Sequence, residues 1–170
     1  MLHQLFELDE ENNLPTWFSS FLLLNNAAIS WLISSTAKTK KRHWQVLAVG
    51  FLLLAIDEVA GLHETFYSSI DDNWTIYAAP LVLIIGAAYL QFLISLPRKT
   101  AYWFCLSGFL YVGGALGIEW LAQDMDEDSF SYALAVAVEE GAEMAGALLF
   151  LSGNLIYLRT LHPVVSIELR

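Results

Sequence analysis

The sequence of 170 residues has a single cysteine, four histidines and eight basic residues. One cysteine excludes an internal disulfide and any metal site built from several cysteines. The few basic residues form no broad surface, which excludes nucleic acid as a partner. We also expect no cleavable signal peptide, because the first 13 residues are acidic and lack a basic segment.

Apolar residues dominate what is present: 56% of the chain is hydrophobic and the mean hydropathy is +0.51. A soluble domain rarely combines these values, whereas a small polytopic membrane protein does so regularly. Five apolar stretches approach or exceed the roughly 20 residues that cross a bilayer. We therefore predict an all-α integral membrane protein, with one domain over residues 1–170 and a bundle of five transmembrane helices. The spans are predicted at residues 14–37, 44–66, 74–96, 101–122 and 130–158.

Charge is divided between the two predicted sides of the membrane. All basic residues fall on one side: Lys38, Lys40, Lys41, Arg42, Arg98, Lys99, Arg159 and Arg170. Acidic residues without a base occupy the other side, at residues 7–11, 71–72 and 124–128. Because cytoplasmic loops carry the excess of Lys and Arg, we predict an extracytoplasmic N-terminus and a cytoplasmic C-terminus, in a plasma (inner) membrane.

Ionisable residues also interrupt the predicted spans, and no lysine or arginine accompanies them. They are Asp57, Glu58, His63, Glu64, Glu119, Glu139, Glu140 and Glu143. Such groups are expensive in hydrocarbon, so they usually have a partner and a function. A rise of about 1.5 Å per residue puts Glu58 and Glu140 at similar depth in the outer half of the bilayer. The positive charge that balances them is expected to come from outside the chain.

Carboxylate and imidazole ligands suit divalent Fe, Mn, Zn, Ca or Mg. We predict that one or two such ions bind Glu58, His63, Glu64, Glu119, Glu140 and Glu143, with Asp57 and Glu139 as additional candidates. In residue type the set resembles the ferritin-like di-iron carboxylate proteins. Glu140 and Glu143, however, give Glu-x-x-Glu where that family has Glu-x-x-His, so its activity is not transferred. A metal-dependent membrane enzyme is one expectation, with no reaction indicated.

Two other functions fit the same residues. Clustered carboxylates in a low dielectric cannot all ionise, so they could hold protons and serve a proton or cation channel, carrier or accessory subunit. Asn25 and Asn26, midway along the first span, could extend a polar path, although interhelical hydrogen bonding is the commoner role of such residues. Alternatively, the acids pair with another membrane protein or a second copy of the chain, in a structural or assembly subunit.

Overall fold

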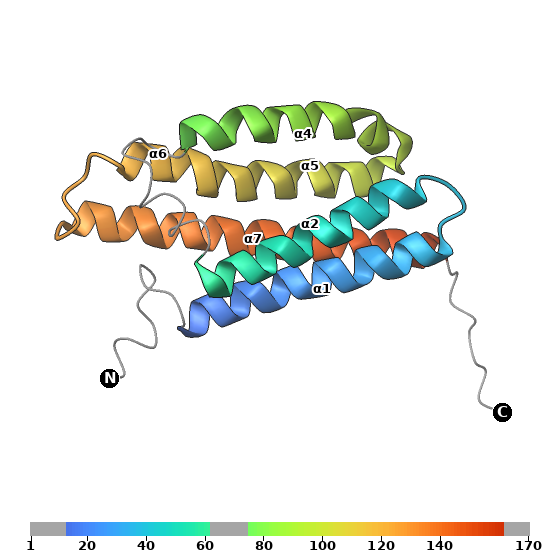
Figure 1. Ribbon diagram of the computed structural model, residues 1–170, viewed down its shortest axis with the longest axis horizontal. Helices are drawn as coiled ribbons and strands as arrows, with labels where there is room; N and C mark the ends of the chain where they lie inside the picture. Colours follow the sequence, from blue (N-terminus) through green and yellow to red (C-terminus); the bar gives the residue numbers. More distant parts are fainter. Residues whose placement is uncertain (1–12, 62–74, 162–170) are drawn as a thin grey trace.

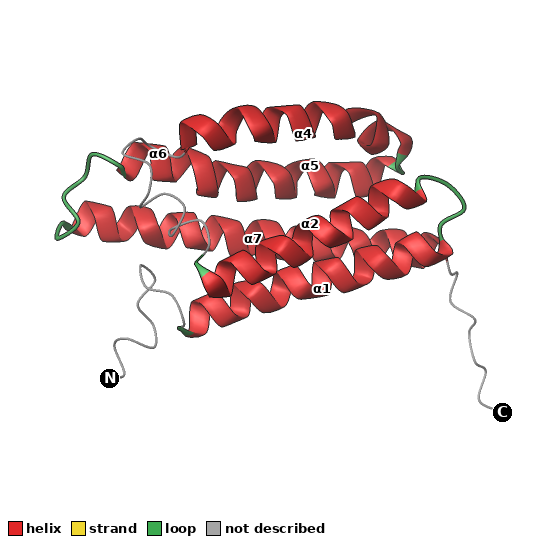
Figure 2. Cartoon of the chain, in the orientation of Figure 1, coloured by secondary structure: helices red, strands yellow, loops and turns green. Residues whose placement is uncertain are grey.

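The computed structural model describes residues 13–61 and 75–161 (Figure 1). In this part of the chain all regular structure is helical (Figure 2), which confirms the all-α prediction. The helices are α1 (Leu14–Thr36), α2 (Lys41–Ala60), α4 (Thr75–Ser95), α5 (Arg98–Val112), α6 (Glu119–Ala122) and α7 (Phe130–Leu161). A π-helix, η1 (Gly113–Ile118), joins α5 to α6, so residues 98–122 form one helical rod.

Three helices of the described chain are long and apolar enough to cross a membrane. They are α2, α4 and the rod Arg98–Ala122. A helix of about 20 residues is as long as the hydrocarbon core is thick. These helices support the coarse prediction of a multi-pass membrane protein in contact with lipid.

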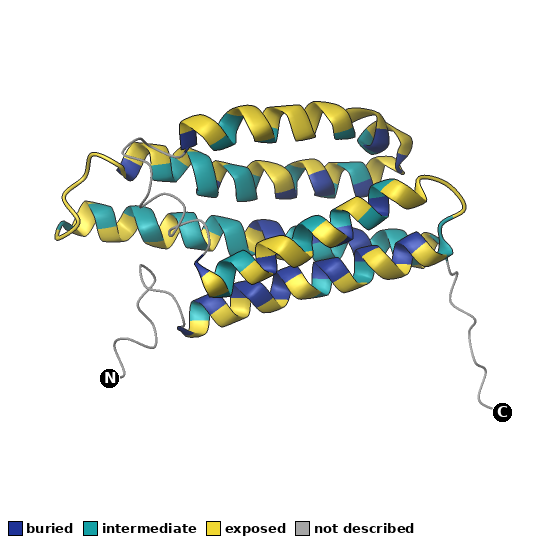
Figure 3. Ribbon diagram, viewed as in Figure 1, coloured by how far each residue is buried: buried dark blue, intermediate teal, exposed yellow. Residues whose placement is uncertain are grey.

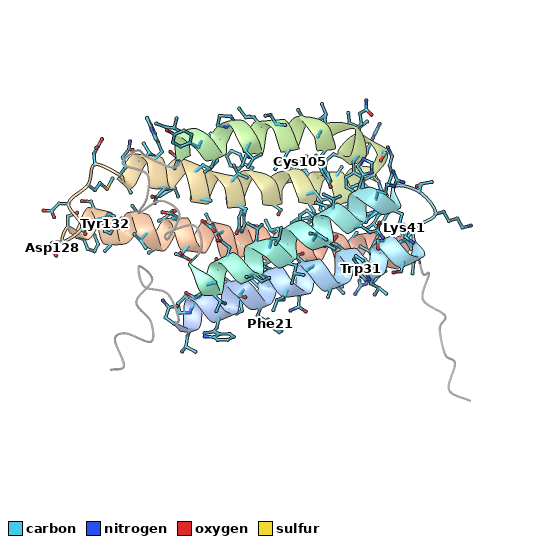
Figure 4. All side chains as sticks on the ribbon, in the orientation of Figure 1. Phe21, Trp31, Lys41, Cys105, Asp128 and Tyr132 are labelled. Carbon is cyan, nitrogen blue, oxygen red and sulfur yellow. The ribbon has the colours of Figure 1, made fainter. Side chains whose placement is uncertain are left out.

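The burial pattern of α1 is inverted relative to a helix of a soluble protein. Its buried face carries many polar residues beside its leucines, and Asn26 and Ser30 are both 0% exposed. Its exposed face is apolar, and Phe21 and Trp31 point away from the bundle (Figure 4). Large apolar patches in contact with water are rare in soluble proteins. Such a pattern is typical of a helix surrounded by lipid, where polar side chains hydrogen-bond between helices.

In the bundle, α7 lies between two helix pairs (Figure 1). It packs against the rod of α5 and η1 on one side and against α1 on the other, and α1 packs along α2. Helix α4 lies at the edge, with Thr75 and Phe92 as its only buried residues (Figure 3). Its Tyr89 hydroxyl donates to the His43 carbonyl of α2 at 3.1 Å, which attaches α4 to the bundle.

The second span is predicted to run to residue 66, and residues 62–66 lie outside the described part of the chain. Helix α2 ends at Ala60, because Gly61 adopts a left-handed conformation with φ 55° and ψ 36°. The Gly61 N–H donates to the Asp57 carbonyl at 2.9 Å, which is a helix C-cap. Glu64 therefore cannot be placed on one face with Asp57 by helical spacing.

The two ends of the bundle differ in charge. We call the end with the α1–α2 and α4–α5 connections the basic end; its described bases are Lys38, Lys40, Lys41, Arg42, Arg98, Lys99 and Arg159, all exposed. The opposite end, which we call the acidic end, holds the α6–α7 connection with its acids at residues 124–128. Lys41 and Asp128 mark the two ends in Figure 4. The charge partition of the sequence is thus also a partition in space.

Candidate functional site

Glu143 is the centre of a group of carboxylates between α2, α5 and α7. Its half-buried side chain forms a hydrogen bond with the hydroxyl of Tyr111, on the last turn of α5. The carboxylates of Glu140, Glu58 and Glu139 lie close enough to act electrostatically on it. We call these four glutamates and Tyr111 the carboxylate cluster.

Three helices contribute to the cluster. Glu58 lies on the last turn of α2, and the other three glutamates lie along just over one turn of α7. Residues three and four apart share a helix face, so Glu139 and Glu140 flank the direction in which Glu143 points. The described lysines and arginines are all exposed at the basic end, at the other end of the bundle from the acidic α6–α7 connection.

A close helix contact fixes the position of Glu143. Gly114 of η1 packs so tightly that a Cβ atom there would lie 2.9 Å from the Glu139 carbonyl oxygen and 3.2 Å from the Glu143 Cγ. Only glycine allows that approach. The contact falls in the π-helix, a conformation that is rare and frequent at functional sites.

The predicted metal ligands are only partly brought together. The structure places Glu58, Glu140 and Glu143 within electrostatic reach, with the additional candidate Glu139. Asp57 and Glu119 are half-buried on α2 and at the start of α6, and neither is among the carboxylates that act on Glu143. The predicted ligands His63 and Glu64 lie outside the described residues.

Metal coordination requires ligand atoms to converge on one point at about 2.0–2.6 Å. Among residues 13–61 and 75–161, no three His, Cys, Asp or Glu side chains are arranged in that way.

Sequence reasoning missed Tyr111 and Gly114. Both belong to a repeating series on the rod that faces α7: Thr100, Phe104, Ser107, Tyr111 and Gly114. Alternating steps of four and three mark one helix face, so this spacing would have identified them as partners of a neighbouring helix.

Asn26 confirms the hydrogen-bonding role that intramembrane asparagines usually have. Its side-chain amide donates to the Ala147 carbonyl of α7 at 2.8 Å, in addition to the Leu22 carbonyl of its own helix. Asn25 instead donates within α1, to the Phe21 carbonyl at 2.7 Å. Of these two asparagines, only Asn26 therefore contributes to the interior of the bundle.

A shallow apolar recess of about 260 Å³ lies on the other side of the rod, between α4 and the η1–α6 segment. Its walls are Thr75, Ile76, Ala79, Leu116 and Trp120. No carboxylate lines it, so it is separate from the carboxylate cluster.

Residues 1–158 match the model of a protein family described as a domain of unknown function, DUF8692. The chain belongs to this family. No curated protein and no solved structure matches the chain. The family description names no activity, so the function has to be argued from the cluster.

Proposed function

We propose that the protein binds and releases protons at the carboxylate cluster, as a multi-pass membrane channel, carrier or accessory subunit for protons or cations. The observation that carries this proposal is the Tyr111–Glu143 hydrogen bond amid three further glutamates. Carboxylates this close cannot all be charged in a low dielectric, so protons are retained among them. A protonated carboxyl in the group can then pass its proton to a neighbouring ionised carboxylate, which receives it.

Proton flux into liposomes is the direct test. Reconstituted protein is given a pH gradient and a potential, and a trapped pH dye reports proton entry. We expect Glu143→Gln to reduce the flux at least about tenfold, because an amide cannot exchange the proton. Glu127→Gln, a matched change in the exposed α6–α7 connection, is expected to leave it unchanged. Equal flux in wild-type and Glu143→Gln protein would refute the proposal.

A divalent metal ion is the second candidate occupant. Two further potential ligands favour it. His63 and Glu64 follow Gly61 by two and three residues, and Gly61 ends α2 one turn after Glu58. Carboxylates together with an imidazole suit Fe, Mn or Zn. Elemental analysis of purified protein, before and after reconstitution with each metal, decides this. A metal occupant predicts stoichiometric metal in wild-type protein and loss of it in His63→Ala. Protein without bound metal under all conditions removes this candidate.

We further propose that five helical segments cross a plasma membrane, with the acidic end extracytoplasmic. They are α1, α2, α4, the rod and α7. The apolar exposed face of α1 and the position of α7 between the other helices support five spans, and the positive-inside rule supports the orientation. Cysteine labelling with a membrane-impermeant maleimide tests both. In a Cys105→Ala background we expect Asp126→Cys to react in intact cells and Thr39→Cys to react only after lysis. The reverse pattern would invert the topology.

A further inference from the structure

Buried polar groups follow α7 from the carboxylate cluster toward the basic end. The Ser107 hydroxyl of α5 donates to the Gly146 carbonyl at 2.7 Å, and Asn26 of α1 donates to the next carbonyl, of Ala147. Seven residues further, the Asn154 amide donates to the Asn26 Oδ1 and the Ser30 hydroxyl, both at 3.3 Å. We call these residues the polar seam.

The seam ends among three polar atoms that lack a partner. Within the described residues, the buried atoms without a hydrogen-bond partner are Trp44 Nε1, Thr100 Oγ1 and Asn154 Oδ1. All three residues are 0% exposed. Buried polar groups are nearly always hydrogen-bonded, so each of these atoms calls for a partner.

The three residues lie within about one helical turn of one another along the bundle. Helices α5 and α7 are antiparallel, and a Cβ on Gly153 would lie 2.8 Å from the Phe104 ring. Thr100, one turn before Phe104, is therefore level with Tyr157, three residues beyond Asn154 on α7. Trp44 reaches the same level, because its ring centroid lies 5.9 Å from that of Phe104 and 5.0 Å from that of Tyr157, on which it stacks.

Their hydrogen-bonding capacities are complementary. The indole N–H of Trp44 can only donate, the Asn154 oxygen can only accept, and the Thr100 hydroxyl does both. Water is the small molecule that satisfies such a set, and buried water typically makes about three hydrogen bonds to otherwise unpaired groups. An apolar ligand would leave these groups unpaired, and a metal ion would be opposed by the Trp44 N–H.

We infer that Trp44, Thr100 and Asn154 form an internal hydration site, which continues the polar seam from the carboxylate cluster to the basic end. The role of this hydration site in proton movement rests on the proposed function, whereas the existence of the site does not. The buried polar side chains named between the cluster and the basic end are those of the polar seam and of this site. Protons that leave Glu143 toward the basic end therefore pass the hydration site.

X-ray radiolytic labelling with mass spectrometry tests the site itself, because hydroxyl radicals form from water bound beside a buried side chain. In the full-length reconstituted protein we expect oxidation of Trp44 despite its 0% exposure, and almost none of Phe92, which is 1% exposed. Thr100→Val should lower Trp44 oxidation several-fold, and Thr160→Val, at an exposed threonine of α7, should not. Trp44 oxidation no greater than that of Phe92, after correction for intrinsic reactivity, would overturn the inference.

Flux measured on the same variants tests the role. We expect Thr100→Val to slow liposome proton flux at least about threefold, while Thr160→Val leaves it unchanged. Loss of flux in Glu143→Gln with unchanged flux in Thr100→Val overturns the inferred role and leaves the proposed function standing. Unchanged flux in Glu143→Gln refutes the proposed function, and the labelling result still decides whether the hydration site exists.

Discussion

The interface between the rod and α7 has two halves that share one spacing and differ in content. Toward the basic end, Phe104 stacks on Phe150 with ring centroids 4.0 Å apart, and Trp44 packs against its edge. Toward the acidic end, Tyr111 and Gly114 instead face half-buried Glu143. We call these the aromatic half and the carboxylate half.

The difference separates stability from function. In the aromatic half, large rings fill the space between four helices, so packing holds the bundle together. In the carboxylate half, several carboxyl groups lie together, and a backbone contact at Gly114 keeps the helices close. We expect changes in the aromatic half to lower the free energy of unfolding, and changes in the carboxylate half to act mainly on proton flux.

Phe104→Ala should have the largest effect on stability. It removes the rings' stacking contacts with Phe150 and leaves a cavity, for which we expect a loss of about 3 kcal/mol in the free energy of unfolding. Denaturant unfolding in detergent micelles measures it. Phe109→Ala is the control, because Phe109 is 75% exposed on the same helix. Similar losses in the two variants would contradict a stabilising aromatic half.

Gly114→Ala tests the contact that shapes the carboxylate half. The new methyl group would meet the Glu139 carbonyl at 2.9 Å, so the helices must move apart, with an expected loss of about 2 kcal/mol in the free energy of unfolding. We also expect lower flux per folded protein, since Glu143 is displaced from Tyr111.

Gly117→Ala is the matched control for that variant. Nothing lies within 4 Å of a Cβ at Gly117, and alanine favours a helix over glycine. It should therefore be neutral or stabilising. If Gly117→Ala is as damaging as Gly114→Ala, the effect belongs to the π-helix backbone and not to the contact with α7.

Tyr111→Phe should have a smaller effect. It removes one hydrogen bond to Glu143 and keeps the ring, which amounts to about 1 kcal/mol or a fivefold change in flux. Liposome flux at several pH values measures it, and Tyr102→Phe, at a position 63% exposed, is the control. An unaltered pH profile in Tyr111→Phe would show that the hydroxyl does not adjust proton binding.

Glu119→Gln should have the smallest effect. Glu119 lies outside the group that acts on Glu143, so we expect less than about a twofold change in flux. A loss comparable to that of Glu143→Gln would extend the cluster to α6.

The fold was largely predictable because apolar length and helix-ending residues determine where the helices lie. The observed helices agree with the predicted ranges to within a few residues, apart from α2, where the left-handed cap at Gly61 ends the helix early. Hydropathy is insensitive to a single glycine conformation, so the sequence alone did not reveal that end. The π-helix was missed for the same reason.

The site was predictable by residue type more than by geometry. Glu58, Glu140 and Glu143 stood out because acids are expensive in a membrane. Tyr111, Gly114 and Asn154 are ordinary residues in apolar helices, and they matter here because of which helix each one faces. Helical depth put Glu119 closer to the outer surface than Glu58 and Glu140, but it could not give the direction of its side chain.

Infrared difference spectroscopy of the reconstituted protein tests the central claim most directly, since a carboxyl group that holds a proton has its own C=O stretching band. At neutral pH we predict such a band in wild-type protein and in Glu127→Gln, and its loss or shift in Glu143→Gln. A spectrum without a protonated carboxyl band at neutral pH, or a band that Glu143→Gln leaves unchanged, would contradict a proton-holding carboxylate cluster.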